Sequence, residues 1–154
     1  MSKLELKIHP PIVFACCAGL SWLISKTADY QIEFYPQVKV VIVITTVVAG
    51  VALAGNAVFQ FHRVGTTIEP TKPDDTSALV TRGVYKFTRN PMYLGLLLVL
   101  TGWVVFLGNI FGILTLVAFV GYITHFQIRP EERVMASKFG EAYANYCQNV
   151  RRWL

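Results

Sequence analysis

Long apolar segments separated by polar ones dominate the pattern along the chain. Residues 38–61 carry no charge except Lys39 near their start, and residues 91–128 contain no Asp, Glu, Lys or Arg. A helix needs about 20 apolar residues to cross roughly 30 Å of hydrocarbon. The pattern therefore predicts membrane-spanning helices over residues 38–61, 91–107 and 111–128.

Residues 38–61 are rich in Val, Ile and Thr, a composition that favours a strand in water. In lipid, however, the open edge of a strand leaves backbone groups without hydrogen bonds, and a segment of 24 residues has the length of a helix. Gly50 and Ala54 lie four residues apart, on one face of that helix. We expect a neighbouring helix to approach closely at this face.

The apolar segments 91–107 and 111–128 are joined by Gly108-Asn109, a turn signal. Pro91 opens the first of them, at a position where its missing N–H costs no hydrogen bond. Because the link is so short, the two segments are predicted to form an antiparallel hairpin. Such a hairpin returns the chain to the membrane face from which it started.

The apolar run near the N-terminus is shorter. It covers 14 residues, 12–25, and Lys3 and Lys7 precede it, as in a signal peptide. No small-x-small cleavage site follows it, however, and a second apolar segment comes soon afterwards. We therefore expect a retained first span over about residues 12–28, with its short length accommodated by tilt or by thinning of the bilayer.

Lys and Arg residues are distributed unevenly about these spans. Two precede the first span, five lie in the polar connection 62–90 and five follow residue 128, whereas only Lys26 and Lys39 lie on the other side. Positive residues concentrate on the cytosolic side of membrane proteins. The chain is thus predicted to be one domain, residues 1–154, with an all-α integral membrane fold. This predicted fold has four transmembrane helices and places both termini on the cytosolic side of a plasma, inner or ER-type membrane.

The segment after the last span is amphipathic. Its apolar residues recur every three or four positions, as on one face of a helix, at Met135, Phe139, Tyr143, Tyr146, Val150 and Trp153. We expect a cytosolic C-terminal helix over residues 130–152. The pattern fits two placements of this helix, one on the membrane surface and one folded back over the cytosolic ends of the spans.

Composition argues against several classes of function. With 54% hydrophobic and 15% charged residues, the chain is more apolar than a soluble domain of 154 residues requires. The net charge of +5 comes from residues that flank the apolar spans, so it reflects membrane orientation, and no nucleic-acid partner is expected. No metal site is expected either, because neither the cysteines nor the histidines have metal-ligand spacing; they are Cys16, Cys17, Cys147, His9, His62 and His125.

Two polar segments bracket the hairpin. Residues 82–93 precede it with arginines and tyrosines, and residues 129–133 follow it with the doublet Glu131-Glu132. Because the hairpin returns the chain to one face, we expect these segments to be neighbours. Each feature has an ordinary explanation: arginines beside anionic lipid, tyrosines in an interfacial belt, and carboxylates in the first turn of a helix. Their combination and order indicate a site.

A set of motifs between residues 80 and 154 resembles the isoprenylcysteine carboxyl methyltransferase and phospholipid methyltransferase superfamily. The motifs follow the family's order: Arg82-Gly83-x-Tyr85, Arg89-Asn90-Pro91-x-Tyr93-x-Gly95, Glu131-Glu132, Phe139-Gly140, Tyr143, Tyr146 and Val150-Arg151-Arg152-Trp153. Family members usually carry His where this chain has Asn90. The chain is also shorter than the eukaryotic isoprenylcysteine enzymes, so it is more similar to the phospholipid enzymes and short prokaryotic members.

The resemblance implies methyl transfer from S-adenosylmethionine. It places the cofactor between the cytosolic ends of the hairpin and the C-terminal helix. The implied contacts are Tyr85, Arg89, Asn90, Tyr93, Gly95, Glu131, Glu132, Tyr143 and Tyr146. The residue types fit this cofactor, because carboxylates suit ribose hydroxyls or an ammonium group, tyrosine faces suit an adenine or a sulfonium, and arginine suits a carboxylate.

The implied methyl acceptor is a lipid-like or prenylated molecule that arrives through the bilayer, where membrane lipids are the other expected partners. Catalytic roles are expected for Arg89, Glu132 and Arg151. A carboxylate acceptor is already nucleophilic and needs only positioning, by Arg89 or Arg151. An amine acceptor must lose a proton, for which Glu132 is the nearest candidate. The choice among O-, N- and S-methylation and the oligomeric state stay open.

Two other interpretations stay open from the sequence alone. Membrane sterol reductases share this architecture but bind NADPH, and the cytosolic arginines do not exclude a 2′-phosphate. A non-enzymatic helical scaffold would keep the fold without any cofactor.

Overall fold

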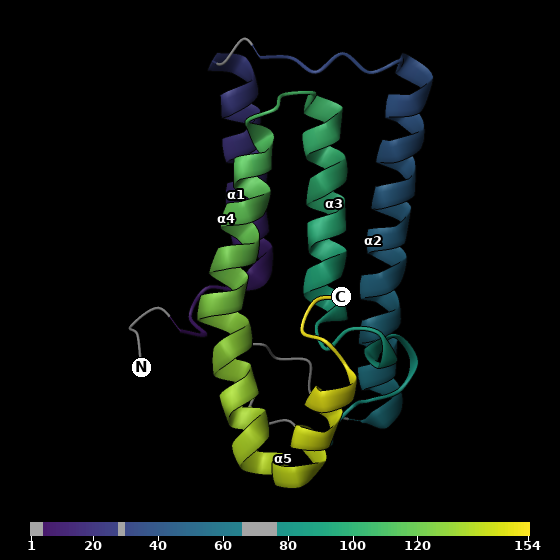
Figure 1. The fold of residues 1–154 in the computed structure, drawn as a ribbon, viewed down its shortest axis with the longest axis vertical. Coiled ribbons are helices and arrows are strands. Elements are labelled where there is room, and N and C mark those ends of the chain that lie inside the picture. The colour runs from purple at the N-terminus through teal and green to yellow at the C-terminus, as the bar shows by residue number, and fades with distance from the viewer. Residues whose placement is uncertain (1–4, 28–29, 66–76) are drawn as a thin grey trace.

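The computed structural model describes residues 5–27, 30–65 and 77–154, and within these ranges the chain is helical and forms no sheet. The helices form an elongated bundle (Figure 1). In chain order they are α1 (Pro10–Thr27), α2 (Pro36–Val64), the 3₁₀ turn η2 (Gly83–Lys86), α3 (Pro91–Leu107), α4 (Gly112–Ile123), the π-helical turn η3 (Thr124–Ile128) and α5 (Arg129–Asn149). The all-helical class predicted from the sequence is confirmed.

Within the described ranges, two helices are long and apolar enough to cross a membrane. One is α2, and the other is the continuous helix Gly112–Asn149, whose charge-free part ends at Ile128. The outward face of α2 exposes large apolar side chains, among them Val41, Ile44 and Val48. An apolar surface of this extent is unusual on a soluble monomer and suits contact with lipid. The shorter apolar helix α3 has 17 residues.

Helix α3 lies between α2 and α4 in the bundle, and α1 packs against both α3 and α4 (Figure 1). The closest approach is at two glycines. A Cβ atom added to Gly50 would lie 2.6 Å from the carbonyl oxygen of Gly95, and one added to Gly95 would lie 2.6 Å from that of Gly50. The predicted close approach at Gly50 and Ala54 is therefore confirmed, with α3 as the neighbouring helix.

The predicted hairpin is also confirmed. Helix α3 begins at Pro91 and ends before Gly108, which adopts the left-handed conformation with φ 71°. Helix α4 then runs antiparallel to α3 (Figure 1). The hairpin and α1 share a core in which Leu100, Phe119 and Ile123 are fully buried.

The fourth apolar segment continues into the C-terminal helix without an interruption. Helix α4 passes through η3 directly into α5, although Pro130 lacks the N–H that would bond the carbonyl of Phe126, four residues earlier. The backbone N–H of Leu6 occupies that carbonyl at 3.0 Å, so the N-terminal segment satisfies the group that the proline leaves open. The predicted start of the C-terminal helix at residue 130 lies one residue after the start of α5 at Arg129, and no loop separates α5 from the fourth apolar segment.

Helix α5 differs from the prediction of one regular helix over residues 130–152. It bends at Gly140, where φ is 50° and ψ is −124°, and it ends at Asn149. The bend turns the chain back, so that residues 150–154 return to the start of α3 (Figure 1). Of the two placements left open, the structure shows the folded-back one.

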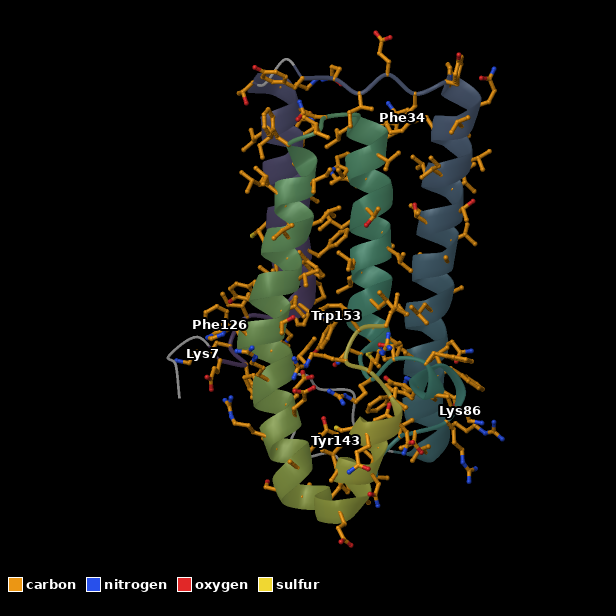
Figure 2. The ribbon with its side chains drawn as sticks, in the orientation of Figure 1. Lys7, Phe34, Lys86, Phe126, Tyr143 and Trp153 are labelled. Atoms are coloured by element: carbon orange, nitrogen blue, oxygen red, sulfur yellow. The ribbon has the colours of Figure 1, made fainter. Side chains whose placement is uncertain are left out.

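The polar connection predicted over residues 62–90 is shorter than expected, because α2 extends to Val64. Part of this connection, with Pro70, Pro73, Asp74 and Asp75, lies outside the described residues. Its last part packs on α2 and carries η2 toward the start of α3. Lys7 and Lys86 lie toward the same end of the bundle as Tyr143 (Figure 2).

Candidate functional site

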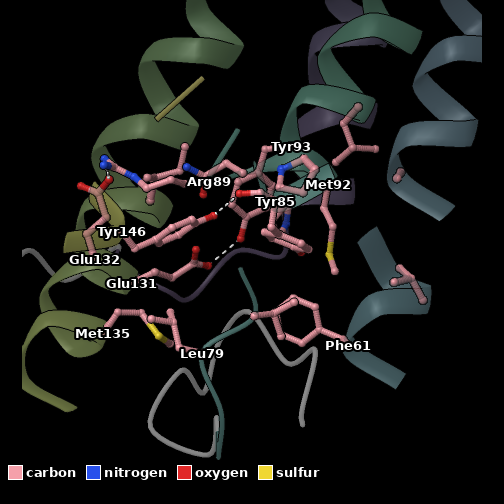
Figure 3. Close-up of a pocket in the computed structure, with 18 of the residues that line it drawn as sticks. Phe61, Leu79, Tyr85, Arg89, Met92, Tyr93, Glu131, Glu132, Met135 and Tyr146 are labelled. Atoms are coloured by element: carbon pink, nitrogen blue, oxygen red, sulfur yellow. Dashed lines mark hydrogen bonds and ion pairs between the residues drawn. The ribbon is translucent and has the colours of Figure 1, made fainter. Parts of the chain in front are cut away.

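A cavity of about 350 Å³ lies at the end of the bundle where α2 and η3 end and where α1 and α3 begin. Its wall is apolar on the side of α2 and α3, with Ala54, Val58 and Leu96. Its other side is polar and combines residues from η2, the start of α3 and α5 (Figure 3). The volume falls in the range of small-molecule sites, about 300–1,000 Å³.

Local backbone geometry places Tyr85 at this cavity. Gly83 has φ 63° and lies so close to α2 that a Cβ atom there would come within 2.3 Å of Nε2 of Gln60. This contact holds η2 on α2, where the ring of Tyr85 meets that of Phe61 edge to face at 5.6 Å. The hydroxyl of Tyr146 in α5 donates to the carbonyl of Tyr85 at 2.7 Å and joins the two sides of the cavity.

Glu132 is held by two arginines. Arg89 donates to its Oε1 at 2.7 Å, and Arg152 donates to Oε1 at 2.9 Å and to Oε2 at 2.7 Å. Burial acts to raise the pKa of Glu132, but these hydrogen bonds and charges outweigh burial and hold the pKa below its ordinary value. Glu132 is therefore an ionised carboxylate near neutral pH.

Glu131 has the opposite environment. Its Oε1 accepts hydrogen bonds from the hydroxyl of Tyr93 at 2.5 Å (Figure 3) and from Nε2 of Gln127 at 2.9 Å. No Lys or Arg among the described residues forms an ion pair with it. Burial raises the pKa of Glu131 to about 7, against the lowering effect of these two hydrogen bonds. A carboxyl group with this pKa exchanges a proton readily near neutral pH.

The tyrosines of α5 and η2 stay neutral. Burial raises the pKa of Tyr85, Tyr143 and Tyr146 above the ordinary value. All three line the cavity.

The structure brings together most residues that the sequence pattern singled out. Eight of the nine predicted cofactor contacts line the cavity: Tyr85, Arg89, Asn90, Tyr93, Glu131, Glu132, Tyr143 and Tyr146. Gly95 does not line it, since it packs against Gly50 in the contact between α2 and α3. The side chain of Arg151 is exposed, and only its backbone carbonyl reaches the site, where it accepts from the N–H of Arg89 at 3.0 Å.

Sequence reasoning missed Gln127 and Arg152. Gln127 is a buried polar residue in an otherwise apolar segment, four positions before Glu131, and that spacing was the available signal. Arg152 stands next to Arg151 in the same basic pair, so the pattern could not choose between them. Among residues 5–27, 30–65 and 77–154, no three His, Cys, Asp or Glu side chains gather as metal ligands do.

Comparison with known proteins assigns the chain to a family. The family described as phospholipid methyltransferase matches residues 38–142, from α2 into α5. The chain belongs to the phospholipid methyltransferase family. The match includes the polar segments that contain Arg89, Tyr93 and the Glu131-Glu132 doublet, and it ends just before Tyr143.

Individual relatives agree with this assignment. The chain is 29% identical over 107 residues to protein-S-isoprenylcysteine O-methyltransferase B of Arabidopsis thaliana, a match that covers 70% of this chain and 54% of the plant protein. It is 49% identical over 63 residues to an uncharacterised protein of Haemophilus influenzae, covering 41% of this chain and all of that protein. No solved structure matches. As a member of the phospholipid methyltransferase family, the chain is a membrane methyltransferase in general terms, and the family implies S-adenosylmethionine as methyl donor.

Proposed function

We propose that this phospholipid methyltransferase family member transfers a methyl group from S-adenosylmethionine to a lipid-like or prenylated acceptor that enters from the bilayer. In this proposal residues 1–154 form one membrane domain. Helices α1, α2, α3 and α4 with η3 cross the membrane, and both termini and α5 are cytosolic. The observation that carries the proposal is the cavity itself, because it joins a polar cluster to the apolar faces of two helices in a member of the phospholipid methyltransferase family.

The charges support this orientation. Lys86 lies toward the end of the bundle that contains the cavity (Figure 2), Arg89 lines the cavity, and Arg152 pairs with the cavity residue Glu132. Lys26 lies in the last turn of α1, and Lys39 follows the start of α2 at Pro36, so both lie at the other end of the bundle. An excess of positive charge marks the cytosolic side. A soluble methyl donor would therefore reach the polar side of the cavity directly from the cytosol.

The residues of the polar side fit this methyl donor. When bound, S-adenosylmethionine supplies an electrophilic methyl group on a sulfonium cation. The aromatic faces of Tyr85, Tyr93 and Tyr146 suit the adenine and the sulfonium, the latter by cation–π attraction. The carboxyl group of Glu131, which accepts hydrogen bonds from the uncharged side chains of Tyr93 and Gln127, suits a ribose hydroxyl or the ammonium group of the donor.

The apolar side of the cavity fits an acceptor with a hydrocarbon chain. Ala54 and Val58 of α2 and Met92 and Leu96 of α3 line it, and both helices belong to the apolar bundle. Burial of its hydrocarbon chain and dispersion contacts would hold such an acceptor, with its reactive group at the polar side of the cavity. Methyl transfer then depends on alignment of the two reacting groups and on exclusion of water.

The geometry changes the roles proposed for the acidic doublet. Glu132 is bound to two arginines and has a lowered pKa, so it is a weak base. For an amine acceptor, Glu131 is the better base, because its carboxylate could accept the proton that the nitrogen loses. The donor would supply the methyl group, with the methyl–sulfur bond breaking as the methyl–nitrogen bond forms and a neutral thioether as the leaving group. For a carboxylate acceptor no proton moves, and Arg89 is a cation that lines the cavity.

Calorimetric titration of the protein in lipid nanodiscs tests this proposal. We expect binding of S-adenosylmethionine and none of NADPH. Glu131→Gln should weaken binding by at least about tenfold, the cost of one charge-assisted hydrogen bond. Glu141→Gln makes the same chemical change at an exposed position of α5 and should bind like the parent protein.

Three results would contradict the proposal. Binding of NADPH without S-adenosylmethionine would indicate a reductase, and binding of neither by a folded protein would indicate a scaffold. Equal affinities for Glu131→Gln and Glu141→Gln would place the methyl donor elsewhere.

A further inference from the structure

The last residues of the chain are fastened to the segment that begins α3. We call residues 150–154 the C-terminal strap. The N–H of Arg89 donates to the carbonyl of Arg151 at 3.0 Å. The carbonyl of Arg152 accepts two hydrogen bonds, from Nδ2 of Asn90 at 2.9 Å and from Oγ1 of Thr88 at 3.3 Å. The strap leaves α5 at Val150, whose backbone is extended with φ −128° and ψ 130°.

The strap is what brings Arg152 to the site. The side chain of Arg152 makes two hydrogen bonds to Glu132, at 2.9 and 2.7 Å. On the other side of Arg152, Nε1 of Trp153 donates to Oγ1 of Thr124 at 3.1 Å, and the ring packs on the core of the bundle. Arg152 is therefore held from both sides, at its own carbonyl by Asn90 and at the next residue by Thr124.

Asn90 is well placed to control this arrangement. It lines the cavity, but its side-chain N–H₂ group is directed to the backbone of the strap. Thr88, the other residue on the same carbonyl, makes the longer bond, and its Oγ1 also accepts from the N–H of Asn90 at 3.2 Å. Loss of the Asn90 amide thus removes the shorter of the two bonds on the carbonyl of Arg152.

We propose that Asn90 is a positioning residue, which holds the C-terminal strap closed and thereby keeps the guanidinium of Arg152 on Glu132. The consequence for methyl-donor binding rests on the proposed function, whereas the closure of the strap does not. Asn90 acts through the strap and makes its contribution at Glu132, which lines the cavity. Without the strap, Glu132 would keep Arg89 as its partner and would lose both hydrogen bonds from Arg152.

The first test measures the strap itself, without any methyl donor. Carboxypeptidase treatment of the full chain in nanodiscs, followed by intact-mass spectrometry, gives the rate at which Leu154 and Trp153 are released. We expect release from Asn90→Ala to be about tenfold faster than from the parent protein, the effect of losing about 1.4 kcal/mol of closure. Asn145→Ala, an exposed asparagine on α5, should release these residues at the parental rate.

A conservative variant separates closure from general damage to the fold. Asn90→His keeps an N–H group that can donate to the carbonyl of Arg152. Release from Asn90→His should return toward the parental rate. Parental rates of release in Asn90→Ala would overturn the proposal, and so would rates that are equally fast in Asn90→Ala and Asn90→His.

The second test asks whether Asn90 acts through Arg152. We expect Asn90→Ala and Arg152→Ala each to weaken S-adenosylmethionine binding by about tenfold and the double variant by little more than either one, because both break the same connection. If the double variant instead bound S-adenosylmethionine about a hundredfold more weakly than the parent protein, the two effects would be independent, and the positioning role of Asn90 would be overturned.

The two tests can distinguish failure of the strap from failure of the proposed function. Faster release from Asn90→Ala together with no binding of S-adenosylmethionine by the parent protein would support the strap and contradict the proposed function. Tight methyl-donor binding with parental release from Asn90→Ala would support the function and overturn the strap.

Discussion

The hydroxyl of Tyr93 donates a hydrogen bond of 2.5 Å to Glu131 and so joins the first turn of α3 to the first turn of α5. The adjacent Glu132 is turned to Arg89 and Arg152 instead. Two neighbouring carboxyl groups thus have opposite environments, and burial raises the pKa of Glu131 whereas the arginines lower the pKa of Glu132. Pairs of titratable groups whose pKa values are driven apart in this way are typical of acid–base sites.

This difference predicts the pH dependence of stability. The pKa of Glu131 rises from 4.5 to about 7 on folding, so the folded state binds more protons than the unfolded state between these values. The free energy of unfolding should therefore be greatest below pH 4.5 as far as Glu131 is concerned, and should fall by up to about 3 kcal/mol as the pH rises through 7. Thermal unfolding in detergent between pH 5 and pH 8 measures this decrease in stability.

Glu131→Gln should remove this loss, because glutamine stays neutral at every pH. Glu141→Gln is the matched control and should keep the parental slope. Glu132 contributes with the opposite sign, since its lowered pKa stabilises the fold above pH 4.5 and that stability is lost on further acidification. A parental slope in Glu131→Gln would show that another group causes the dependence.

Substitution of the two adjacent arginines near the C-terminus should have very different effects on stability. Arg152→Ala removes two hydrogen bonds to the half-buried Glu132 and should lower the free energy of unfolding by about 1–2 kcal/mol. Arg151→Ala removes an exposed side chain and should change it by less than about 0.5 kcal/mol. Urea or thermal unfolding measures the free energy of unfolding of both variants. A larger loss for Arg151→Ala than for Arg152→Ala would contradict the placement of the strap.

The contact between α2 and α3 predicts a difference between two glycines of α2. Gly50→Ala puts a methyl group 2.6 Å from the carbonyl oxygen of Gly95 and should destabilise the fold by about 1–3 kcal/mol. Gly55→Ala meets no atom within 4 Å and should be neutral, or stabilising by up to about 1 kcal/mol through helix propensity. Equal stabilities of the two variants would mean that the helices do not cross at Gly50.

The bend in α5 gives a prediction that depends on backbone alone. A Cβ atom at Gly140 meets nothing within 4 Å, yet φ of 50° with ψ of −124° is strained for an L-residue. Gly140→Ala should cost about 1–3 kcal/mol of unfolding free energy. Gly121→Ala in α4 also has free space around it but no positive φ, so it should cost nothing. Equal costs would argue against the bend.

The sequence predicted the features that follow from periodicity and from the bilayer. The close approach at Gly50, the start of α3 at Pro91 and the turn at Gly108 each depend on one local preference, and the structure has all three. The meeting of the arginine–tyrosine segment with Glu131-Glu132 follows from the hairpin alone. These inferences needed no knowledge of side-chain packing.

The remaining features depend on contacts between distant parts of the chain. Pro130 indicated a helix start, but the N–H of Leu6 supplies the missing partner for Phe126 and lets the helix continue. Arg151 was expected to be catalytic and to lie in a C-terminal helix over residues 130–152, whereas the helix ends at Asn149 and the strap places Arg152 on Glu132.

The central claim is that the cavity lined by Tyr93 and Glu131 positions a methyl donor beside a lipid-like acceptor. The most direct measurement is transfer of isotopically labelled methyl from S-adenosylmethionine into a total lipid extract, by the parent protein and by Glu131→Gln and Glu141→Gln in nanodiscs. Alkaline treatment sorts the product, since methyl esters are cleaved by base and methylated amines are not. We predict labelled lipid from the parent protein and Glu141→Gln, and a large loss in Glu131→Gln. Folded parent protein that binds the methyl donor and labels no lipid, or equal labelling by all three proteins, would contradict the claim.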